Sequence, residues 1–356
     1  MKHLIKLYTK AGAVLLSLML TVILLTPIFI PKYLDGFATT AVVDGFYEIA
    51  PESIDVLFLG SSQIVTAVSP MQLYGETGIT SYSLGTEQQN LVTSYYLLKE
   101  ALQYQNPKVV VLEIFFLFPY NEQSPLNSSE TFVRKPIDCM KWSANKLEAI
   151  RTICQLDDSN ELKSYIFPFL RFHSRWNDLT LNDFTWLFKN KSNPYKGFSL
   201  NTNMQPQEFN GFISSDSSLR ANTMDNMIIY LNKIITLCKE NNISLVLMKT
   251  PRGNGSFSEA CHNTVQEIAD SNNLIFLDFN EKTLFDEISF DCSTDCTDLS
   301  HVNYYGAEKI THYLSNYLSS YYSLPNHKAE PQYVTWNEDL EFYMKQLPSD
   351  SRYPYN

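Results

Sequence analysis

The sequence has no cluster of lysine and arginine after its first ten residues. Its 356 residues include 27 basic and 38 acidic side chains, which give a formal net charge of −11 and a pI near 5.1. This balance argues against nucleic acid as a partner, because phosphate binding needs a basic stripe. The hydrophobic share of 44% predicts a globular chain with room for one large domain or two small ones.

Cysteine is too sparse and too scattered to organise the fold. A disulfide scaffold and a series of CxxC zinc knuckles are both excluded by the spacing. Only Cys292 and Cys296 are close enough in sequence to suggest a local bridge, and the sequence leaves open whether they form a disulfide or remain thiols. The six cysteines are Cys139, Cys154, Cys238, Cys261, Cys292 and Cys296.

A signal-peptide cleavage pattern of the A-x-A type is missing where the N-terminal apolar run ends, at residues 26–33. Residues 11–30 carry no charge over a length that spans a bilayer, whereas a signal peptide has a shorter apolar core. We therefore predict an uncleaved transmembrane anchor at 11–30. Lysines at positions 2, 6 and 10 favour a cytoplasmic tail at 1–10 and an extracytoplasmic domain beyond the anchor.

Strand-like and helix-like segments alternate after the anchor, and no internal repeat is visible. Near-continuous apolar runs indicate parallel strands that are covered on both faces. The pattern predicts an α/β fold, a three-layer α/β/α sandwich with a parallel five-stranded sheet, preceded by one transmembrane helix. The expected strands are residues 54–60, 80–85, 108–115, 243–250 and 274–280, and the expected helices lie within 90–105, 217–240 and 304–322.

Two regions depart from this alternation. Residues 119–216 are rich in Asn, Ser, Phe and Trp, and we interpret them as an insertion over the sheet's catalytic edge within a domain that spans about 50–322. Residues 323–356 contain four prolines among polar and aromatic residues, which predicts an extended C-terminal arm.

The run IDVLFLGSSQ at 54–63 places two serines directly after the first expected strand. Ligands of open parallel sheets bind beyond the carboxyl ends of the strands, where Gly60, Ser61 and Ser62 fall. A serine there is either a nucleophile beside the N–H groups of a helix N-terminus or simply a helix cap. This stretch alone does not decide between the two.

A nucleophilic serine needs a base and a group that orients the base. His301 lies in TDLSHVNYYGAEKI, after the fifth expected strand and just before the last helix, and Asp298 precedes it by three residues. In a tight loop this spacing lets a carboxylate hold Nδ1–H while Nε2 accepts the serine proton. The pair could equally cap the helix or bind a metal.

FLGSSQ, the glycine that ends SYSLG, and DLSH together resemble the SGNH (GDSL-like) hydrolase superfamily in order and spacing, across roughly residues 50–322. The N-terminal anchor, and GSS in place of GDS, resemble the features of the membrane-anchored branch of this superfamily. That branch includes the D-alanyl transfer protein of teichoic acid modification and SGNH proteins of exopolysaccharide O-acetylation. The resemblance implies a serine esterase or acyltransferase without metal or cofactor. Its catalytic residues fall on Ser62, Asp298 and His301, and its oxyanion donors on the N–H groups of Ser62 and Gly85.

One block of the family pattern is absent. An asparagine in a GxND motif completes the family's oxyanion hole after the third strand, but this chain has KVVVLEIFFLFPYN there. Asn90 or a residue from the insertion is a candidate replacement. Loss of one such donor typically lowers the rate about 100- to 1000-fold, so weak hydrolysis is expected. Glu113 in this strand is either a buried, paired structural acid or a general acid, and we favour the structural role.

Further candidate substrate-binding residues lie elsewhere. HSRW at 173–176 places His173, Arg175 and Trp176 together inside the insertion, as a group suited to a carbohydrate or an anionic acceptor, or as a capped turn. Arg252 follows the fourth expected strand at the same sheet edge.

These observations favour a single-pass membrane protein whose extracytoplasmic domain moves or removes an ester-linked acyl group on a cell-envelope polysaccharide. By analogy with the branch, a multi-span membrane O-acyltransferase is an expected partner. Two alternatives stay open. One is an esterase that only hydrolyses glycan or lipid esters, and the other is a catalytically silent binding or assembly module of the same fold.

Overall fold

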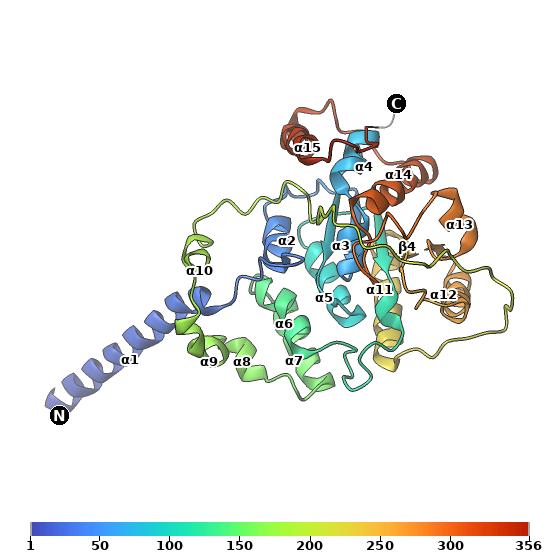
Figure 1. Ribbon diagram of the computed structural model, residues 1–356. Helices are drawn as coiled ribbons and strands as arrows, with labels where there is room; N and C mark the ends of the chain where they lie inside the picture. The colour runs from blue at the N-terminus through green and yellow to red at the C-terminus, as the bar shows by residue number, and fades with distance from the viewer. Residues whose placement is uncertain (1, 355–356) are drawn as a thin grey trace.

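Five parallel strands form the centre of the protein in a computed structural model that describes residues 2–354 (Figure 1). Their order across the sheet is β2-β1-β3-β4-β5, and every neighbouring pair is parallel. All five predicted strands are confirmed, with every end within two residues of its predicted position. The strands are β1 Val56–Gly60, β2 Ser81–Gly85, β3 Val109–Glu113, β4 Ser244–Lys249 and β5 Ile275–Asp278.

Both faces of the sheet are buried, which explains the continuous apolar runs. In β1, Leu57 and Leu59 pack into one core while Val56 and Phe58 pack into the opposite one. Successive side chains of a strand point to opposite faces, so a strand covered on both sides must be apolar at every position. The three-layer α/β/α architecture is therefore confirmed.

Helices from both halves of the chain cover the two faces. One face carries α2 (Thr39–Phe46), α5 (Leu91–Ala101), α11 (Asp225–Glu240) and α12 (Glu259–Asn272). The other carries α3 (Ser62–Ala67), α4 (Pro70–Thr77), α13 (Lys282–Glu287) and α14 (Tyr304–Tyr321). The strand order reverses at β1, where β2 lies on one side and β3 on the other. A crevice for a ligand is expected at such a switch point, beyond the carboxyl ends of the strands.

The N-terminal helix α1 (Lys2–Phe29) projects away from the domain (Figure 1). Among the described residues it is the one helix that is long and apolar enough to cross a membrane, over Ile5–Phe29, and its apolar window is unburied. A helix of this kind is either a membrane anchor or a signal sequence.

The insertion forms short helices that pack beside α2 and α5 and against the end of α1 (Figure 1). Val133, Ile137, Ile150 and Ile153 turn from these helices into the core, which explains the position. Helices α6 and α7 therefore lie beside α2 and α5, and the placement of the insertion over the catalytic edge stays a prediction. Its helices are α6 Glu130–Cys139, α7 Ala144–Leu156, α8 Leu162–Ile166, α9 Phe169–Phe172 and α10 Leu181–Thr185, with the 3₁₀ turns η1 Phe115–Leu117 just before it and η2 His173–Asn177 within it.

The C-terminal segment is less extended than the sequence predicts. After the turn η3 (Pro331–Tyr333), α15 (Val334–Gln346) packs against α4. Trp336 and Tyr343 are two helical turns apart and both buried, and Trp336 lies 5.5 Å from the Tyr74 ring. The prolines interrupt only the flanking residues, so they did not signal this helix.

Candidate functional site

The chain turns sharply between β1 and α3, and this turn presents a serine at the sheet edge. Gly60 has a φ of +149°, and a Cβ there would lie 2.5 Å from Cβ of Glu113, so glycine is required. Ser61 caps α3 by accepting a hydrogen bond from the N–H of Gln63. Ser62 is the first residue of the helix, where its N–H has no partner carbonyl within the helix.

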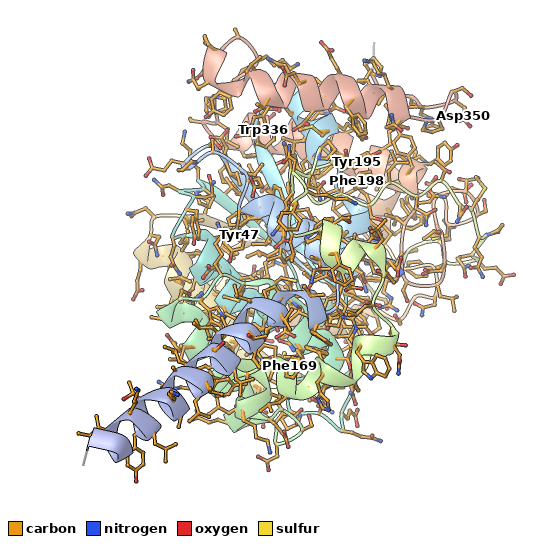
Figure 2. The ribbon with its side chains drawn as sticks, turned by 90° about the vertical axis from the view of Figure 1, so that its left-hand side faces the viewer. Tyr47, Phe169, Tyr195, Phe198, Trp336 and Asp350 are labelled. Atoms are coloured by element: carbon orange, nitrogen blue, oxygen red, sulfur yellow. The ribbon has the colours of Figure 1, made fainter. Side chains whose placement is uncertain are left out.

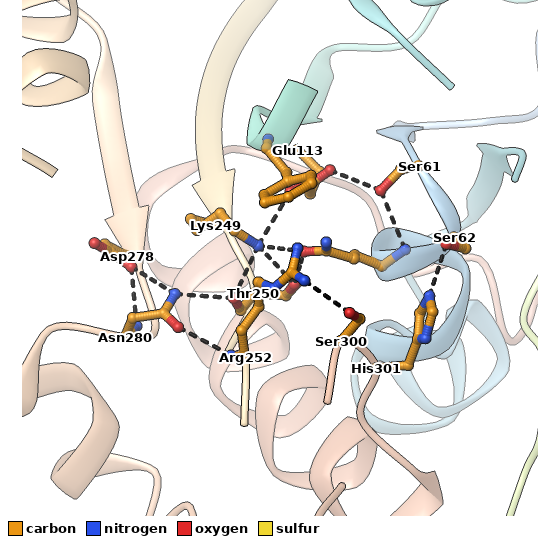
Figure 3. A network of polar contacts seen from close by, with 12 residues as sticks. Ser61, Ser62, Glu113, Lys249, Thr250, Arg252, Asp278, Asn280, Ser300 and His301 are labelled. Atoms are coloured by element: carbon orange, nitrogen blue, oxygen red, sulfur yellow. Dashed lines mark hydrogen bonds and ion pairs between the residues drawn. The ribbon is translucent and has the colours of Figure 1, made fainter. Parts of the chain in front are cut away.

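Ser62 lies beside an imidazole that comes from the far end of the sequence. Its Oγ is 2.8 Å from Nε2 of His301 (Figure 3). Nδ1 of His301 is 2.9 Å and 3.0 Å from the two carboxylate oxygens of Asp298. With the proton on Nδ1, the imidazole donates to Asp298 and accepts the Ser62 hydroxyl proton, which is the geometry of general-base activation.

The loop before α14 keeps Asp298 ionised. One of its oxygens also accepts hydrogen bonds from the N–H groups of Ser300, at 2.7 Å, and His301, at 2.9 Å. Burial alone would raise the pKa of Asp298, but the hydrogen bonds from His301 and Ser300 outweigh it and hold the pKa below its usual value. An ionised Asp298 fixes the orientation of the imidazole.

A pocket of about 200 Å³ opens above these groups. Its walls come from the loops after β1, β2, β3 and β4 and from the loop before α14, as the topology predicts. Phe37, eight residues beyond the end of α1, also lines it, and its ring centre lies 4.9 Å from that of His301. Its principal lining residues are Ser62, Glu87, Gln88, Phe115, Arg252 and His301.

A buried polar network supports the serine turn from behind (Figure 3). Ser61 Oγ donates to Glu113 at 3.1 Å, and the other Glu113 oxygen is 3.2 Å from Nζ of Lys249. Lys249 also donates to the side chain of Gln63. Burial lowers the pKa of Lys249 to about 8, against the opposing effect of Glu113. The prediction that Glu113 is a buried, paired acid agrees with this geometry.

Arg252 is the cation of the pocket wall. It is 6% exposed, its guanidinium lies 4.2 Å from the Phe115 ring centre, and one Nη donates to Ser300 at 2.7 Å (Figure 3). Its Nε is buried without a hydrogen-bond partner, and no carboxylate of the described residues lies within ion-pair distance of it. Burial lowers its pKa, although a guanidinium remains charged in proteins. A buried cation with a spare donor is suited to an anionic oxygen.

Neither of the other residues predicted for the oxyanion hole, Gly85 and Asn90, lines the pocket. Gly85 pairs with Gly60 in the sheet, and a Cβ there would lie 2.5 Å from a methyl carbon of Ile64. Asn90 caps α5 through its side-chain oxygen, while its amide nitrogen is buried without a partner among the described residues. Their roles as donors stay predictions.

The HSRW group lies at the end of α1 instead of beside Ser62. Arg175 donates to the carbonyl of Phe29 at 2.6 Å and pairs with Asp183 at 3.1 Å. His173 and Trp176 are exposed in the same 3₁₀ turn. Substrate binding by this group stays a prediction, and any such contact would occur away from the pocket.

Sequence reasoning missed Lys249, Gln63 and Phe37. A lysine within the apolar run of β4 was a usable signal, because a buried cation demands an acid on a neighbouring strand, here Glu113. Phe37 gave none, since it lies in an irregular segment. Cys292 and Cys296 are free, buried thiols. Among the residues that the structure describes, no group of His, Cys, Asp or Glu forms a candidate metal site.

Comparisons with known proteins do not identify a family for this chain. No family model and no curated protein matches the chain. Among solved structures, a Bacteroides fragilis protein described as a "putative acylhydrolase" aligns at 10% identity with a TM-score of 0.35, over 76% of this chain and 90% of that chain. At that TM-score the likeness carries no argument about function.

Proposed function

We propose that this protein is a membrane-anchored extracytoplasmic serine esterase or O-acyltransferase of the SGNH type, acting on ester-linked acyl groups of a cell-envelope glycan. The observation that carries the proposal is the hydrogen-bonded series Ser62–His301–Asp298 at the carboxyl edge of a parallel sheet. The three side chains come from two loops 236 or more residues apart in sequence, and their alignment is the one that nucleophilic catalysis by serine requires.

In the first half-reaction, Ser62 Oγ attacks the ester carbonyl as its proton passes to Nε2 of His301. A tetrahedral intermediate forms, and its negative oxygen is held by pocket donors. The intermediate collapses when the carbon–oxygen bond to the alcohol breaks and His301 returns the proton to that alcohol. Asp298 remains ionised throughout and stabilises the imidazolium. The product is an acyl ester on Ser62.

In the second half-reaction, an acceptor hydroxyl loses its proton to His301 and attacks the acyl carbon. The bond to Ser62 Oγ breaks, and His301 reprotonates the serine. A glycan hydroxyl as acceptor gives transfer, and water gives hydrolysis. Both outcomes use the same residues, so the choice between them depends on what occupies the pocket.

For the oxyanion we propose the N–H of Ser62 together with Arg252, in place of the absent GxND asparagine. Arg252 lines the same pocket as Ser62 and has an unpaired, buried Nε. A fixed cation in a buried wall stabilises developing negative charge strongly. Gly85 and Asn90 remain candidate donors outside the residues that line the pocket.

Membrane proximity supports an envelope polymer as the acceptor. Phe37 contacts His301 and follows Phe29, the last residue of α1, by eight residues. An extended chain covers at most about 3.5 Å per residue, so the pocket lies within roughly 28 Å of the end of the apolar helix. We propose that α1 is retained with its N-terminus in the cytoplasm, and that a multi-span O-acyltransferase delivers the acyl group. A protease added to intact cells should then digest the domain.

The decisive experiment is intact-mass analysis of the full chain after treatment with a fluorophosphonate. Wild type should gain one adduct, Ser62→Ala none, and His301→Ala should react slowly. Ser61→Ala is the matched control, because Ser61 is the adjacent serine and its Oγ donates to Glu113. Absence of any adduct on wild type would refute an activated serine.

Acyl transfer is then separated from its alternatives in cells that lack the chain. Complementation with Ser61→Ala should restore envelope ester content, and Ser62→Ala should not. Restoration by Ser62→Ala would instead indicate a binding or assembly module. Adduct formation with free acid released at a high rate, and without transfer to added glycan, would indicate an esterase that only hydrolyses.

A further inference from the structure

Large apolar side chains are exposed together on one part of the domain. Between residues 142 and 188, Leu181 is 77% exposed and Phe188 is 90% exposed. Soluble surfaces rarely carry so many in one segment, and contiguous patches mark interaction with a protein or a membrane. We call this surface the apolar rim, and its most exposed members are Trp142, Phe167, Leu170, Trp176, Leu181 and Phe188.

The apolar rim surrounds the place where α1 meets the domain. Phe29 at the end of α1 packs edge-on against Phe169 at 5.1 Å, and Arg175 binds the Phe29 carbonyl. Helices α9 and α10 and the turn η2 all contact α1. Figures 1 and 2 show these helices gathered at that end of α1, on the opposite side of the domain from α15. The rim therefore continues the unburied apolar surface of α1.

A groove of about 590 Å³ runs between α1 and the domain. One wall is formed by Val22, Ile23 and Pro27 of α1, and the facing wall includes Trp142 and Phe167. The groove is mainly apolar, although charged side chains of both signs, among them Asp138 and Lys146, also line it. An acyl chain has the shape and polarity that such a groove accepts.

We propose that the apolar rim lies in the interfacial layer of the bilayer that α1 crosses, with a lipid acyl chain in the groove. Continuity with α1 selects lipid over a soluble partner, because side chains this close to the end of a membrane span lie at the depth of the lipid headgroups. Tryptophan is enriched at that depth, and two of the four tryptophans of the chain belong to the rim. The inference rests on α1 spanning a bilayer and is independent of the chemistry of Ser62.

Tryptophan quenching tests the proposal with the full chain in nanodiscs of phosphatidylcholine brominated in the upper acyl chain. Variants that retain one tryptophan are made by Trp→Phe replacement of the other three. Those retaining Trp142 or Trp176 should lose much of their emission relative to unbrominated lipid. The variant retaining Trp336, which is buried in α15, should be unchanged. Leu20→Trp in a tryptophan-free chain is the positive control for insertion of α1.

Each result is decisive. If Trp142 and Trp176 were unquenched while the tryptophan of Leu20→Trp was quenched, the proposal would be overturned. The apolar rim would then face water or a protein partner. An unquenched Leu20→Trp would overturn it as well, since α1 would lie outside the bilayer. A paired substitution adds a second readout in the chain that retains Trp176.

Leu181→Ser with Phe188→Ser should reduce the quenching of Trp176, because the rim then lies less deeply in the lipid. Val334→Ser is the control, because it removes an exposed apolar side chain from α15, far from α1. Equal quenching in the two variants would contradict the proposal. All three positions are exposed, so thermal unfolding in detergent should be the same for both variants and confirms the fold.

Discussion

Among single residues, Arg252 separates this pocket most clearly from an ordinary helix-capping turn. Its guanidinium is held by Phe115 and Ser300, with a buried nitrogen left to donate. We expect Arg252→Gln to slow fluorophosphonate labelling about 100-fold, the cost of one lost oxyanion donor. Arg252→Lys should recover only part of the rate, because an ammonium lacks the planar fork. The second-order labelling rate is the measurement, with equal thermal unfolding as the control. An unchanged rate in Arg252→Gln would remove Arg252 from the mechanism.

The low pKa of Asp298 predicts how the stability of the fold depends on pH. Its folded-state pKa is held below the usual 3.8, so its contribution to stability is complete above pH 3.8 and is lost as the pH falls through the folded value. Wild type should be more stable than Asp298→Asn at neutral pH, and the difference should shrink below pH 3.8. Urea unfolding of both proteins across this range measures it. A difference that grows toward low pH would show that Asp298 does not hold its ionised form in the fold.

At the scale of elements, the start of α3 depends on its close fit to β2. A Cβ at Gly85 would lie 2.5 Å and 2.8 Å from methyl carbons of Ile64 and Val65. Gly85→Ala should therefore cost about 1–3 kcal/mol in the free energy of unfolding and slow the labelling of Ser62 by displacing its helix. Gly12→Ala is the control, because nothing lies within 4 Å of a Cβ there. Equal stability in urea for the two variants would contradict the argument.

The elements that could be predicted are those whose burial leaves a regular pattern of apolar residues in the sequence. The strands were found because both faces of β1 are covered, so every residue from Val56 to Leu59 is apolar. The sheet edge that joins Ser62 to His301 follows from that parallel order. Helix α15 was not predicted, because its buried face has only Trp336 and Tyr343 as full members. Phe37 reaches the pocket through tertiary packing alone.

For the molecule as a whole, the position of the pocket relative to α1 should matter for transfer but not for the chemistry of Ser62. We expect a flexible Gly–Ser segment inserted after Pro31 to leave fluorophosphonate labelling nearly unchanged while lowering envelope ester content in cells. The labelling rate and the ester content of the envelope are measured on the same variant. Full transfer with a long insert would show that the height of the pocket above the membrane is unimportant.

The contact between Phe37 and His301 has a further consequence for how substrate is encountered. If α1 spans the membrane as we propose, a pocket tethered within roughly 28 Å of it samples a thin layer, and a polymer or acyl donor attached to the same membrane stays in that layer. Confinement of this kind gives effective concentrations in the millimolar range even when the bulk contains few molecules. Evolutionary selection would then act little on the affinity for free sugar. Weak binding of substrate in solution would be compatible with efficient acyl transfer at the membrane surface.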